Sequence, residues 1–538
     1  MKVTLLYRDR EWGKENSYFD KEEICKDLNL HILFRAAGSL YDEEDGGKTV
    51  KVGNERDDYV SEMVKRVMLV PLMSPEEVHY RQQIIKEAVT SYDRTAELYQ
   101  VAKKAMEDIT KFSVAKKKQG YGGSTDQGRR NVANIEYLEH MVYHLDMVEA
   151  AIGHWRDTFV TEEMAEFADN FSDEYRPEYK LCLGKVVKDL RTSAMDGIIE
   201  VTAALGPGLS MSPMVLCDLR EPAKKEKTGF LRNTAGKIGE FYKSLFETDG
   251  MTLEGENQNL LQDIGEIKNA ALGAIMRYFE VFLEEKENFF KQLYAQTAFL
   301  MGAANLYRRI RRIGVDVCFP KITDRENICF EGLVEMSLAI NSLRCPVDNS
   351  LNANGKYLMV VTGANQGGKS TYLRSIGIAQ MLLQCGMFVP AKSFSSGLYR
   401  NVFTHFTRRE DSAMNSGRLD EELGRMERIV DNLTKDSILF LNESFATTTE
   451  KEGSVIAEDI TDALYERGIR VMMVTHLMAF ARNCYAKSLE HAVFLSAERE
   501  TDGHRTFRMV EQEPELTSYG LDLYEGIIGK AKPEPMKI

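Results

Sequence analysis

The sequence contains no apolar run long enough to span a membrane, no recognisable signal peptide and no internal repeat. Its eight cysteines show no CxxC pair and no metal-ligand spacing, so we expect reduced core residues in a cytoplasmic protein. An excess of basic charge is also missing, because 83 acidic side chains oppose 69 basic ones and give a formal net charge of −14. The chain as a whole therefore repels nucleic acid, and any DNA binding must be local, encircling or assisted by a partner.

The most informative stretch is Thr362-Gly-Ala-Asn-Gln-Gly-Gly-Lys-Ser-Thr371, which follows an apolar run from Tyr357 and precedes a helical pattern over 372–385. Strand, glycine-rich turn and helix form the context of a phosphate-binding loop. Glycines let backbone N–H groups converge on phosphate oxygens, and the helix N-terminus adds a favourable dipole. We expect Lys369 to reach the β and γ phosphates of ATP and Ser370 to ligate Mg²⁺. The expected ATP-binding residues of the loop are Gly363, Asn365, Gly367, Gly368, Lys369, Ser370 and Thr371.

Two further apolar runs end in polar residues that would complete such a site. Ser437-Ile-Leu-Phe-Leu-Asn-Glu443 predicts a buried strand. A strand of this kind normally carries an aspartate for the metal shell and then a glutamate that polarises the attacking water. Here Asn442 holds the first position and Glu443 the second. Val471-Met-Met-Val-Thr-His476 ends in a histidine. Alone this histidine is more often structural, but in this order it predicts a γ-phosphate sensor. We therefore interpret Glu443, His476 and Lys369 as catalytic.

These motifs resemble those of the MutS mismatch-repair ATPases, whose nucleotide loop is usually Thr-Gly-Pro-Asn-Met-Gly-Gly-Lys-Ser-Thr-Tyr. The segment 442–453 has the length of the family's Asp-Glu segment, and Thr475-His476 resembles its Thr-His strand end. Ser416-Gly417-Arg418 resembles the start of the signature helix, which implies that Ser416 approaches the partner subunit's ATP. Ser518-Tyr519-Gly520-Leu521 is similar to the sequence that leads into the dimerising helices. The resemblance covers about residues 345–530 and implies an ABC-type P-loop ATPase that uses ATP and Mg²⁺ as a homodimer.

The chain departs from the family pattern at three places. Asn442 replaces the aspartate, which removes one negative charge from the metal shell. Because that aspartate usually acts through a metal-bound water, an amide oxygen can still accept the hydrogen bond, and we expect slow hydrolysis. Leu419-Asp420 replaces the Ser-Thr after Ser-Gly-Arg, and Phe445-Ala446-Thr447 replaces a Gly-Arg-Gly. The sequence therefore resembles a divergent branch of the family.

Upstream of this region the sequence has helical periodicity. One long helix is expected from about Gln258 to Arg312, a second helical region from about Asn134 to Phe171, and a short strand over Met1–Tyr7. Long paired helices resemble the lever arms of the MutS core, although a helical bundle with another partner has the same periodicity. We therefore expect a mixed fold, in which a helical core and lever region precedes an α/β P-loop ATPase domain. The expected segments are 1–26 (N-terminal extension), 27–205 (core and first lever helices), 206–255 (clamp-like insertion), 256–340 (second lever helices) and 341–538 (ATPase domain with C-terminal dimerisation helices).

A basic cluster in the clamp-like insertion is the candidate DNA contact. Its members are Lys224, Lys225, Lys227 and Arg232. Backbone phosphates attract such clusters whatever the base sequence, although a solvated surface loop is the plainer interpretation. About 26 residues precede the core, which leaves no room for the family's mismatch-reading and connector domains. We therefore expect no recognition of single mismatches by an apolar wedge.

Two interpretations of the function follow. In the first, ATP switches a dimeric clamp that acts on repair or recombination intermediates of DNA. In the alternative, ATP drives dimerisation of a scaffold that binds a protein partner and not DNA. The order of lever, clamp and ATPase segments favours the first interpretation, and the acidic net charge of −14 favours the second.

Overall fold

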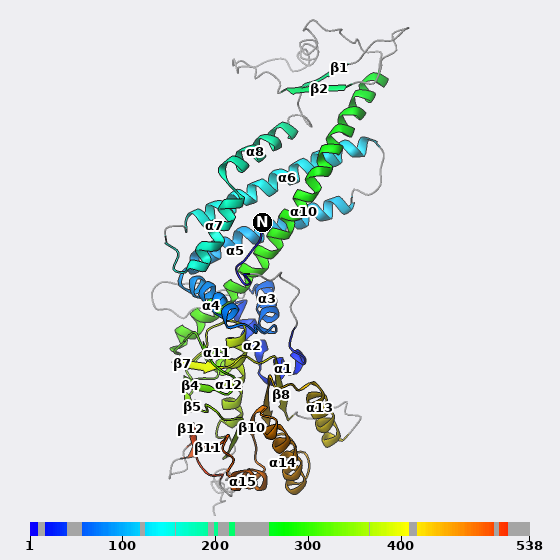
Figure 1. Cartoon of the computed structure of the whole chain (residues 1–538). Coiled ribbons are helices and arrows are strands. Elements are labelled where there is room, and N and C mark those ends of the chain that lie inside the picture. The colour runs from blue at the N-terminus through cyan, green and yellow to red at the C-terminus, as the bar shows by residue number, and fades with distance from the viewer. Residues whose placement is uncertain are drawn as a thin grey trace, which may run out of the picture. The chain divides into compact units, whose positions relative to one another are not determined.

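The computed structural model describes residues 1–8, 17–39, 56–118, 124–155, 158–191, 198–202, 215–220, 258–364, 366–407, 417–499 and 505–514. The chain divides into two compact units, each assembled from separate stretches of sequence. Helices predominate in one unit, and the larger sheets belong to the other (Figure 1). The expected mixed helical and α/β class is therefore confirmed. Unit 1 comprises Met1–Lys2, Gln100–His154 and Ala168–Tyr294, and unit 2 comprises Val3–Tyr99, Trp155–Phe167 and Ala295–Ile538.

Unit 1 is mainly helical. The long helix predicted from about Gln258 forms without interruption as α10, whereas the region predicted over 134–171 is divided between α6 and α7. Leu283, Phe290 and Leu293 of α10 are buried, as the helical spacing of its apolar residues predicts. The unit contains parts of α5 (Tyr92–Lys118), α7 (Glu162–Glu174) and α10 (Gln258–Ile313), and the whole of α6 (Ser124–Gly153), α8 (Pro177–Arg191) and the antiparallel strands β1 (Ile198–Thr202) and β2 (Val215–Arg220).

No helix in the part of the chain that the structure describes combines the length and the apolar character needed to cross a bilayer.

The first helices of unit 2 begin at residues that suit helix starts. Asp57 caps α3 by accepting backbone N–H groups through its carboxylate. Ser74 caps α4 by accepting the N–H of Glu77 through its hydroxyl oxygen, and Pro75 occupies the first helical position, where a missing N–H costs nothing. These helices are α1 (Lys21–Asp27), α2 (Leu30–Ala37), α3 (Asp58–Met68) and α4 (Pro75–Thr90).

The strand predicted over Met1–Tyr7 is wrong, because residues 1–8 form no strand. In unit 2 side chains from other segments hydrogen-bond the backbone that a neighbouring strand would otherwise pair. Gln296 donates from Nε2 to the carbonyl oxygen of Val3 (3.1 Å), and its Oε1 accepts the N–H of Leu6 (2.9 Å). The apolar residues that suggested a strand are buried without sheet pairing.

The main sheet of unit 2 has six strands in the order β12-β11-β6-β10-β9-β8. All neighbours are parallel except β11 and β12. Since β10 lies between β6 and β9, the carboxyl ends of the three strands predicted from the sequence meet at one edge of the sheet. The strands are β6 (Leu358–Gly363), β8 (Asn401–Phe406), β9 (Ser437–Asn442), β10 (Arg470–Val474), β11 (Ala492–Arg499) and β12 (Arg505–Glu511).

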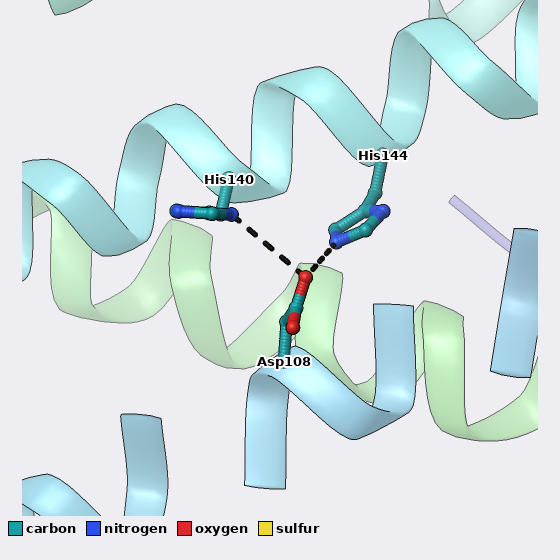
Figure 2. Close-up of side chains that lie close together, drawn as sticks. All are labelled: Asp108, His140 and His144. Carbon is teal, nitrogen blue, oxygen red and sulfur yellow. Dashed lines mark hydrogen bonds and ion pairs between the residues drawn. The ribbon is translucent and has the colours of Figure 1, made fainter. Parts of the chain in front are cut away.

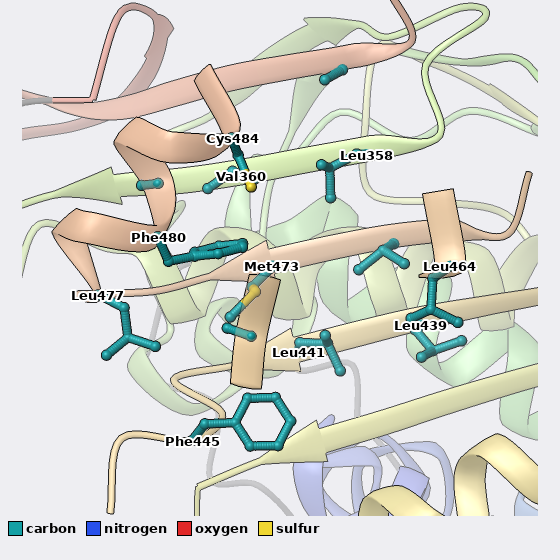
Figure 3. Packing of buried hydrophobic residues seen from close by; sticks show 14 of the residues in the cluster. Leu358, Val360, Leu439, Leu441, Phe445, Leu464, Met473, Leu477, Phe480 and Cys484 are labelled. Atoms are coloured by element: carbon teal, nitrogen blue, oxygen red, sulfur yellow. The ribbon is translucent and has the colours of Figure 1, made fainter. Parts of the chain in front are cut away.

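One face of this sheet carries the core shown in Figure 3. Alternate residues of β6, β9 and β10, among them Val360, Leu441 and Met473, pack with Phe480 from the following helical segment. Helix α12 contacts β6, β9 and β10 but contributes no residue to this cluster, so it covers the opposite face. The helices of this region are α12 (Lys369–Gln384), α13 (Arg418–Asn432), α14 (Glu450–Glu466) and α15 (Met478–Ala486).

A second sheet of unit 2 has the order β3-β7-β4-β5. Its strands are β3 (Lys321–Ile322), β4 (Ile328–Leu333), β5 (Asn349–Asn352) and β7 (Ser393–Ser396), and α11 (Met336–Ser342) joins β4 to β5.

Candidate functional site

The loop between β6 and α12 depends on glycine at three positions. Gly363 has φ +102°, and a Cβ there would lie 2.7 Å from the backbone nitrogen of Ala497. A Cβ on Gly367 would lie 2.8 Å from Cβ of the same alanine. Gly368 caps α12 in the left-handed region, with φ +90°. Only glycine fits these three positions without strain or a clash, so the glycines permit the tight turn that the sequence predicts.

Lys369, the first residue of α12, lies inside this turn. Its side chain is buried, and its Nζ donates to the carbonyl oxygens of Gly363 (2.9 Å) and Ala364 (3.0 Å). Burial lowers the pKa of Lys369, and the neighbouring carboxylate of Glu443 acts in the opposite direction. The lysine therefore lies within the electrostatic reach of the strand-end glutamate, 74 positions away in the sequence.

Glu443 and His476 meet at the carboxyl ends of β9 and β10. Glu443 adopts φ +54°, and its N–H donates to the carbonyl oxygen of Val474 at 2.8 Å. Its Oε2 lies 3.4 Å from Nδ1 of His476. This hydrogen bond raises the pKa of His476 and lowers that of Glu443, so each group favours the charged form of the other.

Asn442 and Ser370 are the candidates for holding Mg²⁺. Within the described residues, Oδ1 of Asn442 is buried without a hydrogen-bond partner. Such an atom gains from an outside donor or cation, because an unpaired buried acceptor is costly. Ser370 follows the buried lysine in the first turn of α12 and remains partly accessible. Neutral oxygens at both positions suit a hard cation that retains several waters, so the residues present fit Mg²⁺.

A cavity of about 530 Å³ opens beside the loop. Loop residues and Glu443 line one side, which brings most of the predicted nucleotide residues to a single pocket. Asn442 and His476 are not among its lining residues. The predicted residues that line it are Gly367, Gly368, Lys369, Ser370, Thr371 and Glu443.

The other side of the cavity was not predicted from the sequence. It is largely apolar and includes Leu338, Val347 and Phe507. Asn349 of β5 connects this side of the cavity to β12. The Nδ2 of Asn349 donates to the carbonyl oxygen of Phe507 (3.3 Å), and the Oδ1 accepts the N–H of Met509 (2.7 Å). No sequence motif marks a contact across 158 positions.

Several predicted site residues lie outside the described residues. They are Asn365 of the loop, Ser416 of the signature motif, the segment 518–521 and the four basic candidates Lys224, Lys225, Lys227 and Arg232. Gly417 is described and caps α13.

A buried strand, a glycine-rich turn with an inward lysine, and a carboxylate at the end of a nearby parallel strand define a P-loop α/β domain. Family comparisons agree with this class and refine it. Residues 359–529 match the model of MutS domain V, and residues 73–313 match that of the MutS2 N-terminal domain. The chain is a divergent MutS-like protein.

Curated relatives give the same family at modest identity. A DNA mismatch repair protein MutS from Acetivibrio thermocellus is 26% identical over 244 residues, covering 42% of this chain and 27% of the relative. A MutS from Thermotoga neapolitana is 31% identical over 184 residues (34% and 23%). An Endonuclease MutS2 from Lactobacillus helveticus is 25% identical over 235 residues (42% and 28%). The chain spans less than a third of the length of these relatives.

Proposed function

We propose that this protein is a MutS-like ATPase that binds and hydrolyses ATP to switch a dimeric clamp acting on DNA, without recognition of single mismatches. The observation that carries the proposal is the convergence of Lys369, Ser370 and Glu443 on one cavity of about 530 Å³. A cavity of this size accommodates a nucleotide. The apolar side that includes Val347 and Phe507 suits a purine base, and the loop side suits phosphates.

Each polar residue has a distinct role in this proposal. Lys369 exchanges its two loop carbonyl partners for the β and γ phosphates. Glu443 orients the attacking water and accepts its proton, and His476 contacts the γ phosphate while its hydrogen bond holds the glutamate. Ser370 and Asn442 hold Mg²⁺, which neutralises charge on the phosphates. Because asparagine brings no negative charge to the metal, hydrolysis is slow.

We assign the dimer and clamp roles to the rest of the chain by analogy with the family. Ser416 contacts the ATP of the partner subunit, and the segments 27–205 and 256–340 provide core and lever helices. The insertion 206–255 grips DNA phosphates through Lys224, Lys225, Lys227 and Arg232. Support comes from the names of the relatives, which are mismatch repair proteins and a MutS2 endonuclease.

A filter-binding titration tests the DNA part of this proposal. Duplex, single-stranded and four-way-junction DNA are titrated at two salt concentrations, with and without ATP and Mg²⁺. The proposal expects salt-sensitive binding to at least one of these, and an effect of nucleotide on its affinity. Absence of binding to all three at the lower salt concentration would favour the scaffold that binds a protein partner, in agreement with the net charge of −14.

A further inference from the structure

Unit 1 contains a cluster of metal-binding side-chain types that shares no residue with the nucleotide pocket. His140 and His144 lie one helical turn apart on α6, and Asp108 approaches them from α5 (Figure 2). Residues four positions apart on a helix project from the same face. The sequence His140-Met-Val-Tyr-His144 therefore directs both imidazoles toward one point, where the neighbouring helix supplies a carboxylate.

The geometry singles out one carboxylate oxygen. Oδ2 of Asp108 lies 3.2 Å from Nε2 of His144 and 3.9 Å from Nδ1 of His140. The other oxygen, Oδ1, accepts a hydrogen bond from Nζ of Lys111 at 2.9 Å. One donor atom from each of the three residues lies within 4.8 Å of the others. Ligand atoms around a tetrahedral zinc ion are about 3.4 Å apart, so small side-chain rotations complete the set.

The surroundings give the cluster a closed inner side and an open outer side. The side chain of His144 is 1% exposed and contacts the ring of Phe290 edge-on, at a centroid distance of 6.0 Å. His140 is 48% exposed and packs against Phe112 at 5.2 Å. The rings of Phe290 and Phe112 would hold the two imidazoles in place around a bound ion, and water ligands would occupy the exposed side.

The protonation states also suit a metal. Burial lowers the pKa of His144, which favours the neutral imidazole that coordinates metals. Although partial burial opposes it, hydrogen bonds from Lys111 and His144 lower the pKa of Asp108 and keep it a carboxylate. A structural Asp108–His144 hydrogen bond would account for two of these residues. It gives no reason for the approach of His140 to the same oxygen.

We propose that Asp108, His140 and His144 bind one divalent transition-metal ion of the Zn²⁺ class, with water at the remaining positions. A set of two imidazoles and one carboxylate binds such ions in preference to Mg²⁺ and Ca²⁺. The bound ion links α5 to α6 within unit 1. The site shares no residue with the nucleotide pocket, and the proposal is independent of the proposed ATPase function.

The test uses the full chain, freed of metal with a chelator and kept without nucleotide or Mg²⁺. Isothermal titration with Zn²⁺ measures the affinity, and Co²⁺ absorption identifies the ligands. The wild-type chain is expected to bind Co²⁺ with visible d–d bands and without a thiolate charge-transfer band, which excludes the eight cysteines as the source. His140→Ala and Asp108→Asn should each weaken Zn²⁺ binding at this site by at least about tenfold.

The matched control is His154→Ala, because His154 is an exposed histidine just beyond the end of α6 and is not a member of the cluster. This variant should bind Zn²⁺ and Co²⁺ like wild type. Unchanged circular dichroism and ATP affinity of His140→Ala would tie its weakened metal binding to the missing ligand. Equal Zn²⁺ affinity of wild type and His140→Ala overturns the proposal, as does a Co²⁺ spectrum dominated by thiolate bands.

Discussion

Nδ1 of His476 lies 3.4 Å from Oε2 of Glu443, which joins the carboxyl ends of two neighbouring strands. The hydrogen bond raises the pKa of His476 and lowers that of Glu443. Below the raised pKa the two groups form an ion pair, and above it a neutral imidazole faces the carboxylate. The protonation of the proposed sensor therefore changes the electrostatic environment of the proposed catalytic base, which stays ionised in both states.

Replacing Glu443 with glutamine should preserve ATP binding and abolish hydrolysis. The amide cannot accept a proton from water, and loss of a general base typically costs about 10²- to 10⁴-fold in rate. Phosphate release measures the rate, and size-exclusion chromatography with light scattering measures the ATP-dependent dimer, which should be trapped. Near wild-type phosphate release by the variant would contradict the role given to this residue. Glu466→Gln, a change at the exposed end of α14, is the control.

Replacing Lys369 with alanine should weaken ATP binding by about 10- to 100-fold. Hydrogen bonds to charged groups contribute about 1.5–3 kcal/mol each, and the variant leaves the phosphate charge uncompensated. Equilibrium binding of labelled ATP gives the affinity. Lys435→Ala changes an exposed lysine outside the pocket and should bind normally. If the Lys369 variant bound ATP as well as wild type, the loop would not be the nucleotide site.

Replacing Asn442 with aspartate should preserve or raise turnover. The side-chain Oδ1 is buried without a partner within the described residues, and a carboxylate there adds charge toward Mg²⁺. The measurement is steady-state phosphate release over a range of Mg²⁺ concentrations, where the variant should saturate at lower Mg²⁺. An enzyme much slower than wild type would show that the strand end is not part of the metal site.

A heteroduplex with one mispair should bind no better than a perfect duplex in competition assays. Discrimination needs base-specific or wedge contacts, whereas the proposed role of the basic cluster in the insertion is to contact phosphates. Replacing Lys224, Lys225, Lys227 and Arg232 with alanine should weaken all DNA substrates by a similar factor. The salt dependence should also fall, by up to about 0.9 in logarithmic slope for each phosphate that the protein no longer neutralises. Alanine at Lys116, Lys117 and Lys118 provides a control of similar charge.

Two results would contradict this prediction. A several-fold preference for the mispair would mean that another segment reads the base step. Undiminished DNA binding by the four-alanine variant would show that residues outside the insertion contact the DNA.

The buried Asp27 should make stability fall as the pH rises. Burial raises its pKa to about 6 from an ordinary value of 3.8, and the contacts from Arg425 offset this only in part. The folded state then binds the proton more tightly than the unfolded state. The resulting stabilisation is complete below about pH 4 and disappears as the pH rises through about 6.

Asp27→Asn removes this titration. In wild type the unfolding free energy falls between about pH 4 and pH 8. In the variant this fall should be smaller by up to roughly 3 kcal/mol, which is the equivalent of the pKa shift. Urea unfolding followed by tryptophan fluorescence across this range measures it. Asp93→Asn, at an exposed position early in α5, should leave the pH profile unchanged. A variant profile parallel to wild type would show that Asp27 does not titrate in this way.

The sequence predicts the parts of the site that local patterns encode. Apolar runs ending at Gly363, Glu443 and His476 mark β6, β9 and β10, because a strand buried on both faces reads as a continuous apolar run. Helical spacing likewise predicts α10. Nothing local marks Phe507 as a wall of the cavity, since its position depends on the pairing of β12 with β11 and on Asn349. The approach of Asp108 to the histidines of α6 depends in the same way on how two helices pack.

The N-terminal part of unit 2 cannot finish folding when it leaves the ribosome. Its stretch Val3–Tyr99 belongs with Ala295–Ile538, and two buried hydrogen bonds join the parts directly. Arg81 Nη1 donates to the carbonyl oxygen of Cys385, and Gln82 Nε2 donates to that of Pro320, across 304 and 238 positions. At about 5–20 residues per second, synthesis of the later partner takes roughly 15 to 60 s. During that time the apolar residues of the first hundred positions must be shielded by chaperones or by transient contacts within the nascent chain.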